Sequence, residues 1–323
     1  MSTATDPRPG PAAAGDAGPG AGPSRARVDR LTWALAVANL LAQLAIIVTG
    51  GAVRLTGSGL GCSTWPMCEP GSFTPVFHEA TSIHPYVEFG NRTMSGVLSV
   101  IALALVWAVH RREPTRSRPA SLKRLTWWPL AGVVLQAVIG GMSVLWVLHP
   151  VIVGSHMLFS LALVAFSTYL LVRLRSADAT PRPRLGGPAR ALPWLLALLA
   201  GAVVILGTVV TGTGPHSGDA DAPYRYALDP VVVTRLHAAA VWVFLAVVVA
   251  VGATLLRSRD AAHLRPARRG WSILLAVTAL EGVIGYTQYL TGLPEVLVGV
   301  HMLGAGLVVA AATLTCSGLY RRA

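Results

Sequence analysis

Eight long apolar runs, separated by shorter segments rich in charged residues, glycine or proline, make up most of the chain after residue 30. A bilayer crossing needs about 20 consecutive apolar residues, and a helix satisfies the backbone polar groups of such a segment internally. The pattern therefore predicts an all-α integral membrane protein with eight transmembrane helices. The predicted spans are residues 31–53, 84–109, 122–143, 149–172, 191–211, 231–256, 271–290 and 294–319.

Composition narrows the class of protein further. The 323 residues are 53% hydrophobic and 12% charged, whereas soluble domains carry about 25% charged residues. This difference excludes an ordinary water-soluble enzyme. The net charge of +12 would suggest nucleic-acid binding in a soluble protein, so the positions of the basic residues decide what the charge means.

The basic residues are distributed unevenly between the two sides of the predicted spans. If the spans alternate in direction, 22 of the 26 Lys and Arg residues lie on the side that holds both termini. Lys and Arg concentrate in cytoplasmic loops, which predicts a multi-pass protein of the cell membrane, surrounded by the lipid bilayer, with both termini in the cytoplasm and no nucleic-acid partner. The four exceptions are Arg54, Arg92, Arg225 and Arg235.

The chain also repeats part of its own sequence. Residues 135–140 recur at 280–285 and residues 154–158 recur at 299–303, with an offset of 145 residues in both cases. Four spans return the chain to its starting side, so the repeat predicts two four-helix bundles of the same topology. The predicted units are a disordered cytoplasmic tail at 1–27, an N-terminal bundle at 28–176 and a C-terminal bundle at 177–323.

His156, His237 and His301 each lie about two turns, or 10 Å, from the outer end of a predicted span. Ionisable residues within a membrane are costly and indicate function. His156 and His301 are equivalent in the repeat, and His237 lies on a helix that can face His301. Two neutral imidazoles from adjacent helices can supply both axial ligands of a haem iron. The alternative is that all three form hydrogen bonds with neighbouring helices.

The N-terminal half is less symmetric, because Asn91 occupies the place that corresponds to His237. Asparagine is a poor iron ligand, so His156 is the only strong ligand expected in this half. A saturated iron suits electron transfer, whereas an open or weakly held iron suits a bound substrate. The sequence thus predicts two haem sites with different roles.

Polar residues near these sites suggest further chemistry. Glu88 shares a helix face with Asn91 and could move protons, or it could form an ion pair with Arg92 or Arg54. A guanidinium group can bind a carboxylate through two parallel hydrogen bonds. Arg54, Arg92 and Arg235 could therefore hold haem propionates, or they could anchor to lipid phosphate instead.

Two further pairs of residues are expected to interact, and whether the pair of cysteines is structural or redox-active stays open. Gln136 and Glu281 are matched across the repeat and are expected to form interhelical hydrogen bonds. Cys62 and Cys68 lie in the first outer loop, where the compartment is oxidising, and we expect them to form a disulfide.

These residues resemble the haem A synthase family. The loop motif RLTGSGLGC at 54–62, followed by WPMC at 65–68, is similar to that family's first outer loop. Residues 88–92 resemble its Glu-x-x-His-Arg motif, with Asn91 in place of the histidine. The resemblance covers about residues 30–320 and includes the three histidines.

The resemblance implies an oxidoreductase that converts the C8 methyl of haem O to a formyl group by successive hydroxylations, giving haem A for terminal oxidase assembly. It implies haem b on His237 and His301, substrate haem near His156, Glu88 as catalytic acid or base, and a disulfide in the outer loop. Implied partners are haem O synthase, a protohaem farnesyltransferase, and cytochrome oxidase assembly factors.

Two functions of other classes fit the same residues. One is a membrane b-type cytochrome that carries electrons, although no histidine pair lies near the cytoplasmic end of any predicted helix. The other is a haem-binding chaperone without chemistry, which needs a haem pocket as much as a synthase does.

Overall fold

The structure is a computed structural model that describes residues 27–77, 82–220, 224–258 and 261–322. Eight helical segments among these residues are long and apolar enough to cross a membrane, which confirms the predicted all-α membrane protein. The predicted tail, apart from residue 27, lies outside the described residues. The helices are α1 (Arg30–Leu55), α2 (His84–Arg111), α3 (Ala120–Leu125), α4 (Trp127–Leu145), α5 (Pro150–Arg175), α6 (Leu192–Thr213), α7 (Pro230–Arg257), α8 (Ala261–Leu290) and α9 (Glu295–Gly318).

Two of the eight spans are built from more than one element. The third span, Ala120–Leu145, combines the short α3 with α4. The fifth, Gly187–Thr213, joins the 3-10 helix Gly187–Ala191 to α6. A two-residue antiparallel pairing of β1 (Arg182–Pro183) with β2 (Tyr320–Arg321) ties the connection between the two halves to the end of the chain.

Helix starts follow from local chemistry. Asp29 caps α1 by accepting hydrogen bonds from the backbone of Leu31 and Thr32, and Asp229 caps α7 in the same way. Such caps satisfy N–H groups that have no partner within the helix. Proline occupies the first helical position of α5 and α7, where its fixed φ angle suits the helix.

The prediction for the start of the seventh span was wrong by ten residues, because α8 begins at Ala261 and not at 271. The basic run before the apolar stretch is itself helical. Arg268, in this extension, donates hydrogen bonds to the carbonyl oxygens of Leu255 (3.1 and 2.8 Å) and Ser258 (3.2 Å), and so caps the end of α7. The length of the apolar run corresponds to the thickness of the hydrocarbon core of the membrane, whereas the helix itself continues into the interfacial region.

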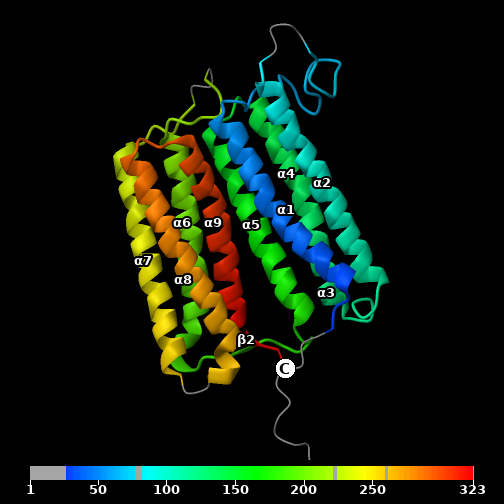
Figure 1. The fold of residues 1–323 in the computed structure, drawn as a ribbon, viewed down its shortest axis with the longest axis vertical. Helices are drawn as coiled ribbons and strands as arrows, with labels where there is room; N and C mark the ends of the chain where they lie inside the picture. The colour runs from blue at the N-terminus through cyan, green and yellow to red at the C-terminus, as the bar shows by residue number, and fades with distance from the viewer. Residues whose placement is uncertain (1–26, 78–81, 221–223, 259–260, 323) are drawn as a thin grey trace, which may run out of the picture.

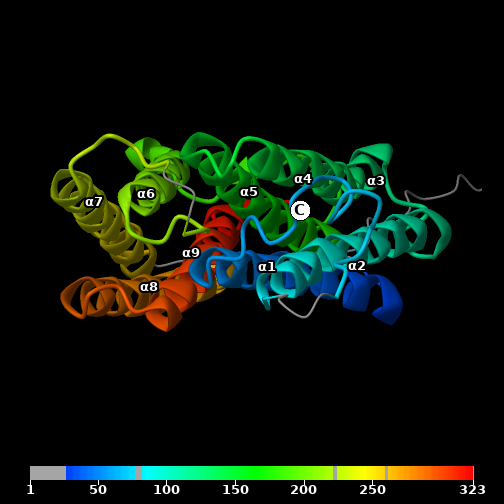
Figure 2. The same cartoon turned by 90° about the horizontal axis from the view of Figure 1, so that it is seen from above.

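The helices contact one another in two rings of four. Helices α1, α2, α4 and α5 form one ring, and α6, α7, α8 and α9 form the other. The rings lie side by side and meet where α1 and α5 contact α9, and where α5 contacts α6 (Figure 2). That the two rings are repeated bundles of the same topology stays a prediction, but their contact places residues of α5 and α9 at the centre of the molecule.

The loops and the termini identify the two ends of the molecule. The loops after α1 and α6 lie at one end, and the start of α1 and the C-terminus lie at the other (Figure 1). At the second end Arg118 donates hydrogen bonds to the carbonyl oxygens of Leu174 (2.6 Å) and Ser176 (2.6 Å) and to Asp178 Oδ1 (2.7 Å). These bonds join the segment before α3 to the end of α5.

Candidate functional site

A cavity of about 1970 Å³ lies between the helices and is lined from both rings. Pockets for small molecules commonly have about 300–1,000 Å³, so this cavity has room for more than one large ligand. Most of its lining is apolar, as expected for a haem-sized macrocycle. Eight of the predicted site residues line it: Arg54, Glu88, Asn91, Arg92, His156, Arg235, His237 and His301.

Each of the three histidines packs against a glycine of a neighbouring helix. A side-chain carbon on any of these glycines would lie 3.3–3.4 Å from the Cε1 atom of the ring, closer than ordinary contact. The glycines therefore let each imidazole lie along a helix backbone at the cavity wall. The pairs are Gly140 with His156, Gly207 with His237, and Gly285 with His301.

Asn91 lies in the same relation to Gly50, at a looser 3.8 Å. Its Oδ1 atom accepts a hydrogen bond of 2.7 Å from the Thr49 hydroxyl, which links α2 to α1. Sequence reasoning missed the glycine contacts, although Gly140 and Gly285 end the repeated segments 135–140 and 280–285. Their identity across the repeat was the available signal.

The ring nitrogens of the histidines have unequal partners. The Nδ1 atoms of His156, His237 and His301 are all buried, and none makes a well-oriented hydrogen bond among the described residues. His301 differs, because its Nδ1 lies 2.7 Å from Glu281 Oε2. Buried polar atoms without partners are costly, so the three rings are held at the cavity wall despite that cost.

These donors fit a haem better than a bare metal ion. The part of the chain that the structure describes contains no group of three or more His, Cys, Asp or Glu residues that could hold a metal ion. Haem iron needs only axial ligands from the protein, and single imidazoles at the wall of an apolar cavity supply them. The residues present therefore fit a haem.

Glu88 is 5% exposed and accepts hydrogen bonds at both carboxylate oxygens. The backbone N–H of Cys62 donates to Oε2 at 2.7 Å, and Arg92 donates to Oε1 from Nε at 3.1 Å and from Nη2 at 2.6 Å. The ion pair with Arg92, one of the alternatives that the sequence leaves open, is thus present. The other alternative partner, Arg54, is directed elsewhere.

The first outer loop closes over this ion pair. Arg92 also donates to the carbonyl oxygens of Thr64 (3.0 Å) and Met67 (3.2 Å), which fastens the loop to α2. The disulfide predicted between Cys62 and Cys68 is confirmed. Within the loop, Trp65 lines the cavity. The disulfide loop therefore covers the cavity beside the predicted catalytic carboxylate.

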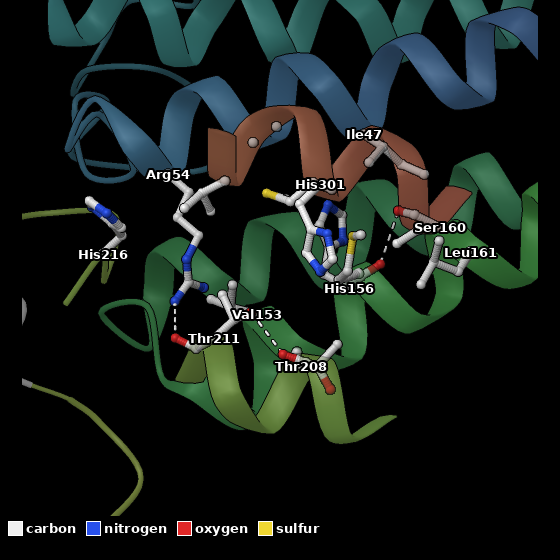
Figure 3. A pocket seen from close by; sticks show the side chains of 18 of the residues that line it. Ile47, Arg54, Val153, His156, Ser160, Leu161, Thr208, Thr211, His216 and His301 are labelled. Atoms are coloured by element: carbon white, nitrogen blue, oxygen red, sulfur yellow. Dashed lines mark hydrogen bonds between the residues drawn. The ribbon is translucent and has the colours of Figure 1, made fainter. Parts of the chain in front are cut away.

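Arg54 crosses from the N-terminal half to the C-terminal half. Its Nη2 atom donates a 2.9 Å hydrogen bond to the carbonyl oxygen of Thr211 at the end of α6 (Figure 3). Its Nε atom is buried and has no hydrogen-bond partner among the described residues. The sequence predicts Arg54 beside the substrate haem of the first half, but the structure places its guanidinium between the two halves.

The residues matched across the repeat do not make matched contacts. Gln136 donates from Nε2 to the backbone oxygen of His156 (2.9 Å) and to Ser160 Oγ (2.5 Å), which is the expected interhelical hydrogen bonding. Glu281 also links two helices, but it does so through the imidazole ring of His301. Sequence reasoning missed this contact with a predicted iron ligand.

The fold and the cavity define a multi-pass helical membrane protein with three histidines at the wall of one large cavity. The chain matches the family described as cytochrome oxidase assembly protein over residues 32–217, more than half of its length, and it belongs to that family. The family's description connects its members with the assembly of cytochrome oxidase.

Several relatives are named heme A synthase. The chain is 31% identical over 189 residues to the protein of Symbiobacterium thermophilum, covering 56% of this chain and 59% of that one. It is 33% identical over 146 residues to that of Lysinibacillus sphaericus, covering 45% and 44%. It is 26% identical over 218 residues to that of Staphylococcus epidermidis, covering 65% and 68%. The chain thus spans between about half and two thirds of the length of these relatives.

Proposed function

We propose that this chain is a haem A synthase, an oxidoreductase that converts the C8 methyl group of haem O to a formyl group. The observation that carries the proposal is that His156, His237, His301 and Glu88 all line one large cavity. The names of its relatives support the same reaction. The product, haem A, would serve the assembly of a terminal oxidase.

In the C-terminal half, His237 of α7 and His301 of α9 are the proposed axial ligands of a haem b iron. A haem b bound there would supply one-electron redox chemistry. Arg235 lies two residues before His237 and lines the same cavity, so its guanidinium can bind a haem propionate. The glycines opposite both rings, Gly207 and Gly285, make room for the imidazoles at the cavity wall.

In the N-terminal half, His156 is the proposed ligand of the substrate iron. Asn91 offers only a weak donor, and its amide oxygen is already bonded to Thr49. Substrate held firmly from one side alone can leave after oxidation, as an enzyme with turnover requires. Arg92 and Arg54 are the proposed partners of the substrate propionates.

Glu88 is the proposed catalytic acid or base. Oxidation of a methyl carbon to a formyl carbon releases protons, and the Glu88 carboxylate lies at the cavity wall where it can accept one. Arg92 holds Oε1 and so fixes the direction of the carboxylate. The disulfide loop above it limits the access of bulk water to this point.

The proposed location is the cell membrane, with both termini in the cytoplasm and the histidines near the outer leaflet. The concentration of 22 of the 26 basic residues on one side of the eight spans supports this orientation. Haem O synthase, a protohaem farnesyltransferase, and cytochrome oxidase assembly factors are the proposed partners, and no nucleic acid is expected to bind.

The test is expression of the full chain in a host that makes haem O but no haem A, followed by haem extraction and mass analysis. Haem A or its hydroxylated intermediate is the expected result. Haem O bound without conversion would favour a haem-binding chaperone, and haem b alone would favour an electron-carrying cytochrome. Either of the last two results contradicts the proposed function.

A further inference from the structure

One acidic side chain inside the membrane has no role in the function proposed above. Glu281, nine residues before the end of α8, is 9% exposed, and its Oε2 atom lies 2.7 Å from His301 Nδ1 on α9. A carboxylate at this depth is costly unless it serves a partner. Its partner here is the ring of a proposed iron ligand.

The helix backbones around this pair make room for it. A side-chain carbon at Gly304, three residues after His301, would collide with the Glu281 carboxyl group. A side-chain carbon at Gly285, four residues after Glu281, would lie 3.3 Å from Cε1 of the His301 ring. The carboxylate and the imidazole therefore each occupy a space that a glycine of the opposite helix leaves open.

The N-terminal half lacks this arrangement at the matching positions. Gln136 corresponds to Glu281, but it bonds the backbone oxygen of His156 and not the ring. Phe159 stands where Gly304 stands in the second half, so the space for a carboxylate beside the ring is not provided. The Nδ1 atom of His156 has no hydrogen-bond partner among the described residues. The carboxylate contact thus distinguishes His301 from His156.

We propose that Glu281 is a positioning residue that fixes His301 and tunes the iron it binds. The Glu281 carboxylate lies against Nδ1 of the ring, which leaves Nε2 as the nitrogen available to the iron. A carboxylate partner also makes the imidazole a stronger donor, which stabilises ferric iron and lowers its reduction potential. This inference rests on the proposed haem site of the C-terminal half.

The test compares Glu281→Gln with the wild-type chain, both full length, purified in detergent and loaded with haem b. The variant keeps the size of the side chain but offers a neutral oxygen to Nδ1. Loss of an outer-shell partner changes metal binding by about 10–100-fold. A tenfold change in the preference for ferric over ferrous iron corresponds to about 59 mV for one electron. We therefore expect the midpoint potential of the low-spin haem to rise by about that amount.

A second readout separates tuning from a merely structural role. Electron paramagnetic resonance of the ferric low-spin haem reports the donor strength of its axial imidazoles, so the g values should shift in Glu281→Gln. The matched control is Gln136→Leu, which removes the equivalent side chain of the first half. This control should leave the potential and the g values of the C-terminal haem unchanged.

Each result of these measurements either supports or contradicts the proposed role of Glu281. A fully loaded Glu281→Gln protein with unchanged potential and g values would overturn the proposal while the proposed function stands, since haem A formation is measured separately. If Glu281→Gln binds no haem, Gly304→Ala provides the comparison, because its methyl group displaces the carboxyl group without removing it. A raised potential in that variant supports the proposal, and an unchanged one overturns it. A wild-type chain that binds no haem would contradict the proposed function as well.

Discussion

Glu88 and Arg92 lie one turn apart on α2, and Arg92 Nη2 is 2.6 Å from Glu88 Oε1. The same guanidinium holds two carbonyl oxygens of the disulfide loop, and the loop returns a backbone N–H from Cys62 to Glu88 Oε2. The predicted catalytic carboxylate and the cover of the cavity therefore form one hydrogen-bonded unit. Changes to either part are expected to affect the other.

Glu88→Gln is expected to reduce haem A formation by about 100-fold or more, because general acid–base groups contribute about 10²–10⁴-fold. The b-type spectrum of the C-terminal half should persist, since neither His237 nor His301 contacts Glu88. Product analysis and an optical spectrum of the same preparation measure both effects. Glu295→Gln, an exposed position at the start of α9, is the control. An unchanged haem A yield in Glu88→Gln would remove the catalytic role.

Replacing both Cys62 and Cys68 with serine is expected to lower haem A yield and thermal stability together. The disulfide closes the loop that positions the Cys62 N–H on Glu88, and a lost disulfide commonly costs about 2–4 kcal/mol. Thermal unfolding in detergent and product analysis test this expectation. Cys316→Ala, which removes a free thiol in α9, is the control. Full yield in the double variant would show that the loop closes without its covalent link.

The spans and the disulfide could be predicted from the sequence because each depends on local pattern. An apolar run of sufficient length determines a membrane helix wherever it occurs. The contact of Glu281 with His301 could not be predicted, since it joins residues on two helices and depends on how α8 packs on α9. The reach of Arg54 to Thr211 depends in the same way on how the two halves meet.

Replacing single histidines should separate the two haem sites. His301→Ala is expected to remove the low-spin b-type absorbance, because the C-terminal iron would lose an axial ligand. His156→Ala should keep that absorbance and lose bound haem O. Optical spectra and extracted haem, measured for both variants, provide the comparison, and each variant is the control for the other. A full low-spin spectrum in His301→Ala would refute the ligand assignment.

Asp178 provides a stability prediction that depends on pH. Hydrogen bonds from Arg118 hold the pKa of Asp178 below its ordinary value. A lowered folded-state pKa stabilises the fold above the unfolded value of about 3.9, and that contribution is lost as pH falls through the folded-state pKa.

Asp178→Asn should therefore unfold more easily than the wild type at pH 7, by about 1 kcal/mol for this partly exposed pair. The difference should shrink as the pH is lowered below about 4. Thermal unfolding across pH in detergent measures it, with the exposed Glu113→Gln as the control. A difference that does not depend on pH would assign the effect to packing.

Asn91→His tests why the two halves differ at one position. An imidazole at 91 would give α2 a histidine at the position that corresponds to His237 of α7, and it would lose the hydrogen bond from Thr49. We expect substrate haem to gain a second strong axial ligand, which would appear as a second low-spin signal and as slower product release. Optical and electron paramagnetic resonance spectra with bound haem O would show the signal, and single-turnover product analysis would show the release rate.

Asn91→Gln, which keeps an amide, is the control and should give no new low-spin signal. If Asn91→His also gives none, residue 91 does not face the substrate iron, and the haem O site must lie on His156 without it.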